Sequence, residues 1–467
     1  MKKRFFKLTL LVAILLLTSI VFSSCSLLLS EESGAIIGGE KYITNAYINS
    51  YGELILCYSD GTSDNVGHVV GRDGEDGKDG IDGQDGKDGV DGLDGKDGIN
   101  GQDGKDGTII SGSGNASLEF SVASCLQSTV LIDCGFKTSL SSIVNDSYSS
   151  GSGIIYSCNK LTGDAIIVTN YHVVYDSQSL TFNGISDDIK VYLYGSRSTD
   201  KAIEATYIGG SMNYDLAVLK ISNSDIIKNH EISPVRLRSS DDIHVGEASF
   251  ALGNPRGDGF SVTSGIISVD SENVEIPASD GSGAITMRLL RTDTPVNSGN
   301  SGGGLFDANG YLIGIVNAKI KELGVEGFGY AIPSSTMEAV VENILYYCLD
   351  TNLESLKRPL LGISVKITNP YTKYNSETGY VDLYESSTVV EVSPTALAYN
   401  KIFAGDIIKE VSISGSCEMS VEVTRQYKLL DILLNARIGD TVYVTVERNG
   451  NLITEKFIIT PTCISNS

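Results

Sequence analysis

Three polar side chains in separate segments of the chain are of the types that acyl transfer requires. His172 lies within an apolar run, Asp215 directly precedes the apolar residues Leu216–Leu219, and Ser301 lies in a glycine-rich run. A serine nucleophile needs a base that takes its hydroxyl proton, a carboxylate that holds the tautomer of that base, and N–H donors for the developing oxyanion. Histidine is suited to act as base and acid near neutral pH. The three residues together predict a catalytic triad.

Small residues on both sides of Ser301 allow a tight turn and a close approach of the backbone to a substrate. Gly299 and Asn300 directly precede the serine. The amides of Gly299 and Ser301 would point at the developing oxyanion, where each donor contributes roughly 3 kcal/mol. We therefore expect an oxyanion hole within Gly299–Ser301.

Each of these residues also has a plainer structural interpretation. A lone histidine in a strand is usually structural, a lone buried aspartate is usually part of a turn or cap, and Gly-Asn-Ser-Gly-Gly could be an ordinary loop. The order His, Asp, Ser along the chain is nevertheless one of the few that triad enzymes use, and it differs from the order in α/β-hydrolases. The combination favours catalysis. The other histidines, His68, His230 and His244, lie near no cluster of carboxylates or cysteines at ligand spacing, so we expect no metal and no cofactor.

Short strands separated by turn residues surround the three polar residues. Gly151–Tyr156 and Asp164–Thr169 are examples, and their spacing predicts an all-β barrel or sandwich. The run Ser335–Glu338 has the pattern of a capping box, and apolar residues at helical spacing follow it as far as Cys348. We expect this helix to close a domain that spans residues 119–350.

The segments around the predicted triad resemble the HtrA/Deg family of trypsin-like serine proteases from about Phe120 to Thr460, about three quarters of the chain. The matching motifs are T-N-x-H-V-V at His172, Y-D-L-A-V-L-K at Asp215, L-G-N-P at Leu252–Pro255, T-D-T-P-V-N-S-G-N-S-G-G-G-L from Thr292, and G-F-G-Y-A-I-P at Gly327–Pro333. Ser298 and Gly304 stand where the family has proline. The resemblance implies a chymotrypsin-like double β-barrel and a homotrimeric serine endopeptidase that degrades unfolded or damaged exported proteins.

The resemblance also implies where a substrate side chain binds. Trypsin-like enzymes form the base of the primary specificity pocket six residues before the nucleophile, where this chain has Pro295 rather than a carboxylate. Gly327, Tyr330 and Ala331 are the further substrate-binding residues that the resemblance implies. Because no anion would meet a Lys or Arg side chain at Pro295, we expect cleavage after small or medium aliphatic residues.

The C-terminal part of the chain resembles the α+β PDZ domain of HtrA proteins, which we expect over residues 357–462. The segments that carry the likeness are Arg358–Ile363, Ala404–Ile408 and Gly439–Val442, whereas Ile367–Glu391 diverges. PDZ domains bind extended peptides at a sheet edge and capture a C-terminal carboxylate on backbone amides. The resemblance assigns these amides to Leu361, Gly362 and Ile363. A degenerate module that only packs on the protease domain is the alternative.

The N-terminus has the pattern of an export signal. Four basic residues precede the largely apolar run Leu8–Phe22, which is too short to span a bilayer comfortably because about 20 residues are needed. Val21–Cys25 resembles a bacterial lipobox, although Phe22 stands where leucine is preferred. A diacylglyceryl group on Cys25 would supply the two hydrophobic signals of a stable anchor. We expect an extracytoplasmic protein tethered by lipid to the outer face of the bacterial cell membrane, with plain secretion as the alternative.

Glycine occupies every third position from Gly71 to Gly107, and aspartate usually fills the third place of each triplet. Strict glycine at this period is required by a collagen triple helix. The repeat lacks proline, so an acidic flexible spacer is the alternative to a trimeric rod. The remaining N-terminal boundaries are a signal peptide at 1–24, an anchor with a small β module at 25–70 and a linker at 108–118.

The composition argues against some classes of function for the whole protein. A net charge of −23 over 467 residues argues against binding nucleic acid, because Lys and Arg must neutralise phosphates. The eight cysteines include no CxxC pair, and a disulfide between Cys125 and Cys134 is left open. Two functions remain: an extracytoplasmic serine endopeptidase, and a collagen-like structural or adhesive surface protein whose protease fold is an inactive scaffold. The complete set of triad residues favours the first.

Overall fold

The computed structural model describes residues 43–48, 53–58, 62–68, 118–139, 144–181, 183–196, 201–254, 259–318, 327–348, 356–376 and 378–466. The chain divides into two compact units, residues 1–103 and 104–467. The predicted signal peptide, Cys25 and the collagen-like repeat lie outside the described residues, so these remain predictions. No helix in the described ranges has the length and apolar character needed to cross a bilayer.

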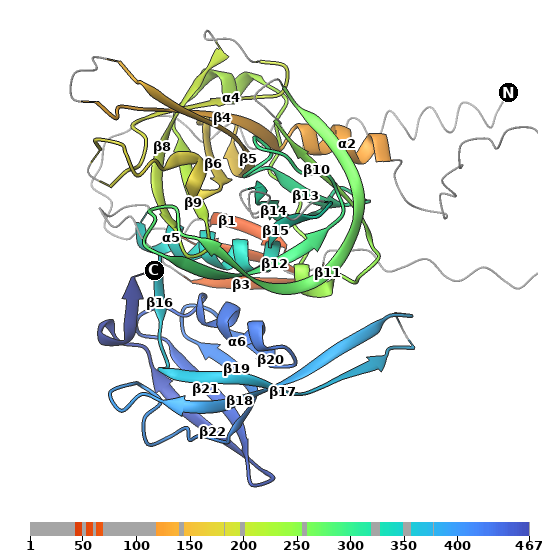
Figure 1. The fold of residues 1–467 in the computed structure, drawn as a ribbon, viewed down its shortest axis with the longest axis vertical. Helices are drawn as coiled ribbons and strands as arrows, with labels where there is room; N and C mark the ends of the chain where they lie inside the picture. The colour runs from red at the N-terminus through yellow and green to blue at the C-terminus, as the bar shows by residue number, and fades with distance from the viewer. Residues whose placement is uncertain are drawn as a thin grey trace, which may run out of the picture. The chain divides into compact units, whose positions relative to one another are not determined.

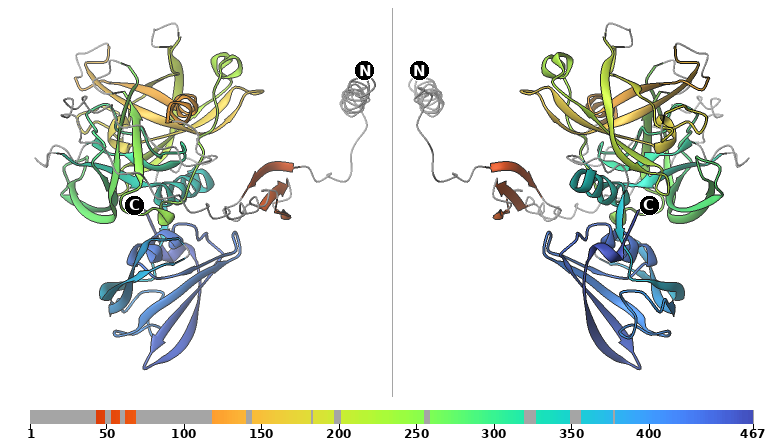
Figure 2. Two further views of the ribbon diagram at one scale, coloured as in Figure 1. Left: turned by 90° about the vertical axis from the view of Figure 1, so that its right-hand side faces the viewer. Right: turned by 90° about the vertical axis from the view of Figure 1, so that its left-hand side faces the viewer.

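The first unit contains a small antiparallel sheet. Its strands are β1 (Ile43–Ile48), β2 (Glu53–Tyr58) and β3 (Ser63–His68), paired in sequence order. They are the red arrows of Figure 2. The sheet lies where alternating apolar and polar residues predict short strands.

The second unit begins with α2 (Leu118–Leu126), which leads into a closed β-barrel. Its strands follow the order β4-β5-β6-β9-β8-β7 around the barrel. Their bounds are β4 (Thr129–Phe136), β5 (Ser147–Asn159), β6 (Asp164–Thr169), β7 (Asp188–Tyr192), β8 (Ile203–Ser211) and β9 (Leu216–Ile221). β-Branched residues such as Val130, Ile132 and Ile167 fill the interior and are fully buried. Short helices α3 (Tyr171–Val174) and α4 (Asp225–Asn229) follow β6 and β9.

A second closed barrel follows, with the strand order β10-β11-β12-β15-β14-β13. Its strands are β10 (Ala248–Gly253), β11 (Ser261–Pro277), β12 (Ala284–Thr292), β13 (Gly304–Asp307), β14 (Leu312–Val316) and β15 (Gly329–Pro333). Phe250 and Phe306 stack in its core with ring centroids 5.3 Å apart. The prediction of a double β-barrel is confirmed, and Figure 1 shows the first barrel in orange to yellow-green and the second in green to teal.

Helix α5 (Ser334–Cys348) packs on the barrels after β15. It begins one residue before the predicted capping box, so Ser335 lies inside the helix. The Ser335 hydroxyl bonds to Ser240 at 2.8 Å and to Asp241 at 3.1 Å. Both partners belong to the short 3₁₀ helix η2 (Ser240–Asp242). The sequence predicts the helix correctly. The capping bond expected for Ser335 within its own helix is wrong, because its hydroxyl bonds to η2 instead.

Residues 356–466 form an α+β domain. Its main sheet has the order β17-β18-β19-β21-β22, with β20 beside β19, and a short β16-β23 pair adjoins it. The elements are β16 (Lys357–Pro359), β17 (Ile363–Tyr374), β18 (Val381–Val392), β19 (Ile407–Ser414), β20 (Met419–Glu422), α6 (Gln426–Leu433), β21 (Thr441–Arg448), β22 (Asn451–Ile458), η5 (Pro461–Cys463) and β23 (Ile464–Asn466). The divergent stretch Ile367–Glu391 forms most of the long β17–β18 hairpin, which projects from this domain in Figure 1.

Polar contacts join this domain to the barrels. Arg288 on β12 bonds to Asp431 on α6 at 2.7 Å, and the Thr336 hydroxyl donates to the same carboxylate at 3.0 Å. The Asn343 side chain donates to the Leu434 carbonyl at 2.9 Å. Helix α6 is therefore in contact with both β12 and α5.

Candidate active site

The structure brings His172 and Asp215 together in the first barrel. His172 lies in α3, and Asp215 ends the turn before β9. The imidazole Nδ1 is 2.7 Å from Asp215 Oδ2, and the His172 backbone N–H donates to Oδ1 at 3.0 Å. Asp215 is 2% exposed, and His172 bonds to both of its carboxylate oxygens. This arrangement fixes the orientation of the imidazole ring.

The backbone at Asp215 is itself unusual. Its φ is +47°, in the left-handed region that residues other than glycine seldom adopt. The Tyr171 N–H and the Asn170 side-chain amide both donate to its carbonyl, at 3.1 and 2.9 Å. Strained backbone conformations cluster at functional sites, where the surrounding structure over-determines them. Here the residues before His172 hold the strained turn.

A residue that sequence reasoning missed also donates to the Asp215 carboxylate. Asn317 directly follows β14 in the second barrel and is fully buried. Its amide nitrogen donates to Asp215 Oδ2 at 2.9 Å. The next residue, Ala318, donates its backbone N–H to Ser301 Oγ at 3.2 Å. The dipeptide Asn317–Ala318 therefore touches two members of the predicted triad.

Ser301 lies in the turn before β13, beside the segment that carries His172. Gly151 on β5 lies between the two, since a Cβ added there would contact Val173 at 2.7 Å and the Ser301 carbonyl at 3.1 Å. Among the described residues, Ser301 Oγ bonds to the Ala318 amide and not to His172. Catalytic hydrogen bonds in enzymes without substrate are often long or unformed. The structure therefore places Ser301 near the segment of His172, without a bond between the two side chains.

The turn before β13 contains the two predicted oxyanion donors, the N–H groups of Gly299 and Ser301. Gly299 has a φ of +96°, which suits glycine, and the intervening Asn300 N–H donates to the Asn297 carbonyl at 2.9 Å. Within the described ranges, the N–H groups of Gly299 and Ser301 donate to no protein acceptor. Two unengaged amides beside a serine hydroxyl can bind a developing oxyanion.

The predicted substrate-binding residues lie on both sides of this turn. Pro295 is exposed, and its carbonyl accepts a bond from the Thr263 hydroxyl at 2.7 Å. Gly327 is exposed, whereas Tyr330 and Ala331 are buried in β15. The Tyr330 carbonyl accepts from the Asn317 N–H at 2.8 Å. The last bond connects β15 with Asn317, the residue after β14 whose side chain donates to Asp215.

Val296 is a second residue that the sequence reasoning missed. Its side chain is 3% exposed, and a Cβ added at Gly329 would lie 3.0 Å from it. The buried side chain that faces Gly329 is therefore that of Val296, next to the exposed Pro295. A Cβ at Gly329 would be crowded, so the apolar Val296 side chain packs closely on β15.

The three residues predicted to bind a peptide carboxylate lie at the entrance of β17. Leu361 is buried, and Gly362 has a φ of +71°. The carbonyls of Leu361 and Gly362 accept from the backbone amides of Ala398 and Ser393, at 3.0 and 2.9 Å. Ile363 begins β17, an edge strand of its sheet.

The open disulfide question is answered by the structure, in which Cys125 and Cys134 are free thiols. Cys125 packs in a core cluster with second-barrel residues, and Cys134 packs inside the first barrel. Burial raises the pKa of Cys125 to about 12. Both residues are small buried side chains without a bridge.

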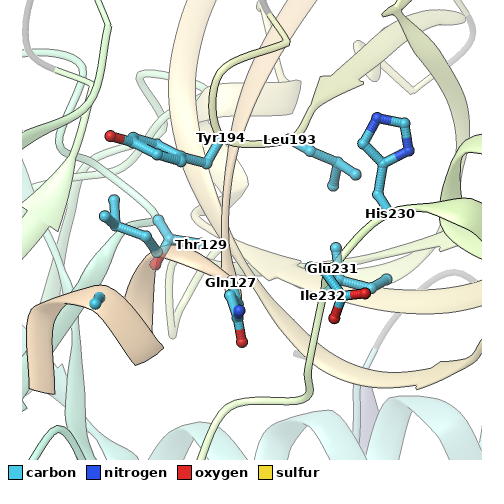
Figure 3. Close-up of a pocket in the computed structure, with 9 residues that line it drawn as sticks. Gln127, Thr129, Leu193, Tyr194, His230, Glu231 and Ile232 are labelled. Atoms are coloured by element: carbon cyan, nitrogen blue, oxygen red, sulfur yellow. The ribbon is translucent and has the colours of Figure 1, made fainter. Parts of the chain in front are cut away.

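A separate cavity of about 390 Å³ lies beside α2, away from the triad. Figure 3 shows Tyr194, Thr129 and His230 around it, together with the other residues that line it. None of the predicted catalytic residues lines this cavity. It adds no chemical group to the site.

Known proteins are similar to parts of this chain. Residues 151–315 match the family model of the trypsin-like peptidase domain. The solved HtrA-type protease AlgW with tripeptide is similar over 75% of this chain and 98% of that chain, with 24% identity and a TM-score of 0.48.

Two named serine proteases are similar over about two thirds of the chain. The Do-like HtrA of Bacillus subtilis (strain 168) is 34% identical over 66% of this chain and 62% of its own length. The Do-like HtrA of Lactococcus lactis subsp. cremoris (strain MG1363) is 35% identical over 66% of this chain and 69% of its own length. The chain therefore belongs to the HtrA family of Do-like serine proteases, which are serine endopeptidases.

Proposed function

We propose that the protein cleaves peptide bonds with Ser301 as nucleophile, His172 as general base and acid, and Asp215 as the residue that orients the base. The observation that carries this proposal is the 2.7 Å bond from His172 Nδ1 to a carboxylate that is 2% exposed. With Nδ1–H donating to Asp215, Nε2 carries the lone pair that takes the serine proton.

In the first step, Ser301 Oγ attacks the scissile carbonyl carbon while its proton passes to His172 Nε2. The carbonyl oxygen becomes an oxyanion, which the free amides of Gly299 and Ser301 stabilise. His172 then gives the proton to the leaving amine, and the acyl enzyme forms. Water then attacks the acyl carbon while His172 takes its proton, the bond to Ser301 Oγ breaks, and His172 returns the proton to Oγ as the carboxylate product leaves. The Asp215 carboxylate stabilises the imidazolium each time it forms.

Unfolded or damaged exported proteins are the proposed substrates, and cleavage after small or medium aliphatic residues is the proposed specificity. Supporting the second point, neither the exposed Pro295 nor its buried neighbour Val296 carries a charge. A Lys or Arg side chain would find no buried anion at either position.

The C-terminal domain is proposed to be a PDZ module that binds peptide C-termini. Its edge strand β17 follows a loop with glycine at positive φ, and α6 lies beside that strand, since Gln426 Nε2 donates to the Val365 carbonyl at 3.3 Å. An edge strand next to a helix is the arrangement that adds a peptide strand.

The proposed setting is the outer face of the bacterial cell membrane, with Cys25 carrying the lipid and the repeat from Gly71 to Gly107 acting as a trimeric rod. Support comes from the sequence patterns alone. A homotrimer is proposed with them, since three chains joined by a rod would raise the local concentration of the protease domains.

A fluorophosphonate probe tests the catalytic assignment, because it reacts with a serine only where base and oxyanion donors activate it. We expect labelling of wild-type protein at Ser301 and cleavage of unfolded casein. Ser301→Ala should lose both and keep the same thermal unfolding. A folded wild-type protein that takes no label would contradict the proposal and favour the inactive scaffold.

A further inference from the structure

A second serine, Ser152 on β5, lies directly beneath the turn that carries Ser301. It is fully buried. Its backbone N–H donates to the Ser301 carbonyl at 2.8 Å, and its hydroxyl donates to the Gly299 carbonyl at 2.8 Å. The same hydroxyl accepts from the backbone N–H of Asn254 at 2.9 Å. Ser152 of the first barrel therefore donates hydrogen bonds to two carbonyls of the turn that carries Ser301.

These bonds fix the peptide group between Gly299 and Asn300. Its carbonyl end is held by the Ser152 hydroxyl, and its N–H end donates to the Asn297 carbonyl at 2.9 Å. Gly299 joins this fixed peptide group to the Ser298–Gly299 peptide group, whose N–H is the first predicted oxyanion donor. Glycine rotates more freely than any other residue, so the direction of the Gly299 N–H depends on the anchoring of its neighbour.

The surroundings offer a poor replacement for the Ser152 hydroxyl. The Asn254 backbone N–H is 3.4 Å from the Gly299 carbonyl, at the long limit of a hydrogen bond. Asn254 Nδ2 and Asn300 Oδ1 are already buried without a partner in the described part of the chain. Each further unpaired group in such a place is destabilising. The turn would therefore rearrange when the hydroxyl is removed.

We propose that Ser152 is a positioning residue for catalysis, whose hydroxyl holds the Gly299–Asn300 peptide so that the Gly299 N–H stays directed at the oxyanion. The inference rests on the proposed function of Ser301. Ser152 touches neither the substrate nor the reacting atoms, so its effect is confined to the step in which negative charge develops.

Ser152→Ala tests this inference in the full-length protein. We expect kcat for a peptide substrate to fall about 10- to 100-fold, less than for the loss of a donor itself, with KM within about twofold. Affinity for a peptide aldehyde should fall by a similar factor, because its hemiacetal oxyanion occupies the same hole. Ser186→Ala is the matched control. Ser186 is buried in the same barrel, and its hydroxyl donates to the Gly135 carbonyl at 2.8 Å, so kcat should be unchanged.

An equal kcat in folded Ser152→Ala and wild type would overturn the inference while leaving the proposed function intact. A rise in KM with unchanged kcat would overturn it as well, because that pattern indicates lost ground-state binding. A folded wild type without activity would overturn both proposals. Should Ser152→Ala fail to fold, Ser152→Cys keeps a weaker donor; a reduced kcat with unchanged KM supports the inference, and a wild-type kcat overturns it.

Discussion

Asp215→Asn is the substitution whose result the geometry determines most narrowly. Asp215 Oδ1 accepts from the His172 backbone N–H at 3.0 Å, and Oδ2 accepts from His172 Nδ1 at 2.7 Å and from Asn317 at 2.9 Å. The new NH₂ group cannot face the His172 backbone, because two donors would meet there. It must then occupy the Oδ2 position, where it donates to Nδ1 and where the Asn317 side-chain amide turns over to present its oxygen in place of its NH₂ group. His172 is forced into the tautomer with its proton on Nε2, which cannot take the proton of Ser301.

The expected loss in kcat is about 10³- to 10⁴-fold, the larger figure being that of the equivalent change in a Ser-His-Asp protease. This corresponds to about 4 to 5.5 kcal/mol of transition-state stabilisation. The loss in kcat is measured from the hydrolysis of an aliphatic peptide substrate. Fluorophosphonate labelling of Ser301 is followed alongside it. Asp164→Asn is the matched control, because Asp164 also accepts two hydrogen bonds in the first barrel, from Thr162 and Asn223. A loss smaller than tenfold in folded Asp215→Asn would refute the tautomer argument.

Two further predictions concern stability and thiol reactivity. Arg448 forms two bonds of 2.7 Å with the buried Asp406 and holds the pKa of that carboxyl below its usual range despite burial. Arg448→Ala should lower the free energy of unfolding by about 2 kcal/mol near pH 7, less than for a fully buried pair because Arg448 is partly exposed. Because this carboxyl has a lowered pKa in the folded state, its stabilising contribution is complete above the unfolded pKa of about 4 and disappears as the pH falls through the lower folded-state pKa. In urea titrations the free energies of unfolding of wild type and variant should therefore begin to approach each other below about pH 4, and a constant difference would contradict this. Cys125, with its pKa raised to about 12, should resist iodoacetamide at pH 8 in native protein and react in urea, as mass spectrometry would show. Rapid native labelling would be inconsistent with that burial.

The candidate catalytic residues could be picked out from the sequence because each is embedded in a short local motif. His172, Asp215 and Ser301 each carry recognisable neighbours, and their order along the chain adds a further constraint. Strand patterns predicted an all-β barrel or sandwich and helical spacing predicted α5, whereas the double barrel was implied by the family resemblance.

The supporting residues could not be predicted, because their roles depend on contacts between distant segments. Asn317 directly follows an apolar strand and carries no local signature, yet it reaches a carboxylate 102 positions earlier in the chain. Ser152 lies in a small-residue stretch that indicated only a strand, and its partner Gly299 is 147 positions away. Cys125 and Cys134 are close in sequence but pack in different hydrophobic clusters. In all these cases the packing of one element on another determines which residues come into contact.

The geometry of the site depends on how the two barrels pack together. The first barrel supplies His172 and Asp215, and the second supplies Ser301 together with Asn317. One hydrophobic cluster includes residues of both barrels, such as Leu216 of β9, next to Asp215. Protein cores transmit small changes in volume, and displacements of about 1 Å at a reacting group can reduce a rate by about 10²-fold. Substitutions in this shared cluster should therefore lower activity at temperatures where both barrels remain folded.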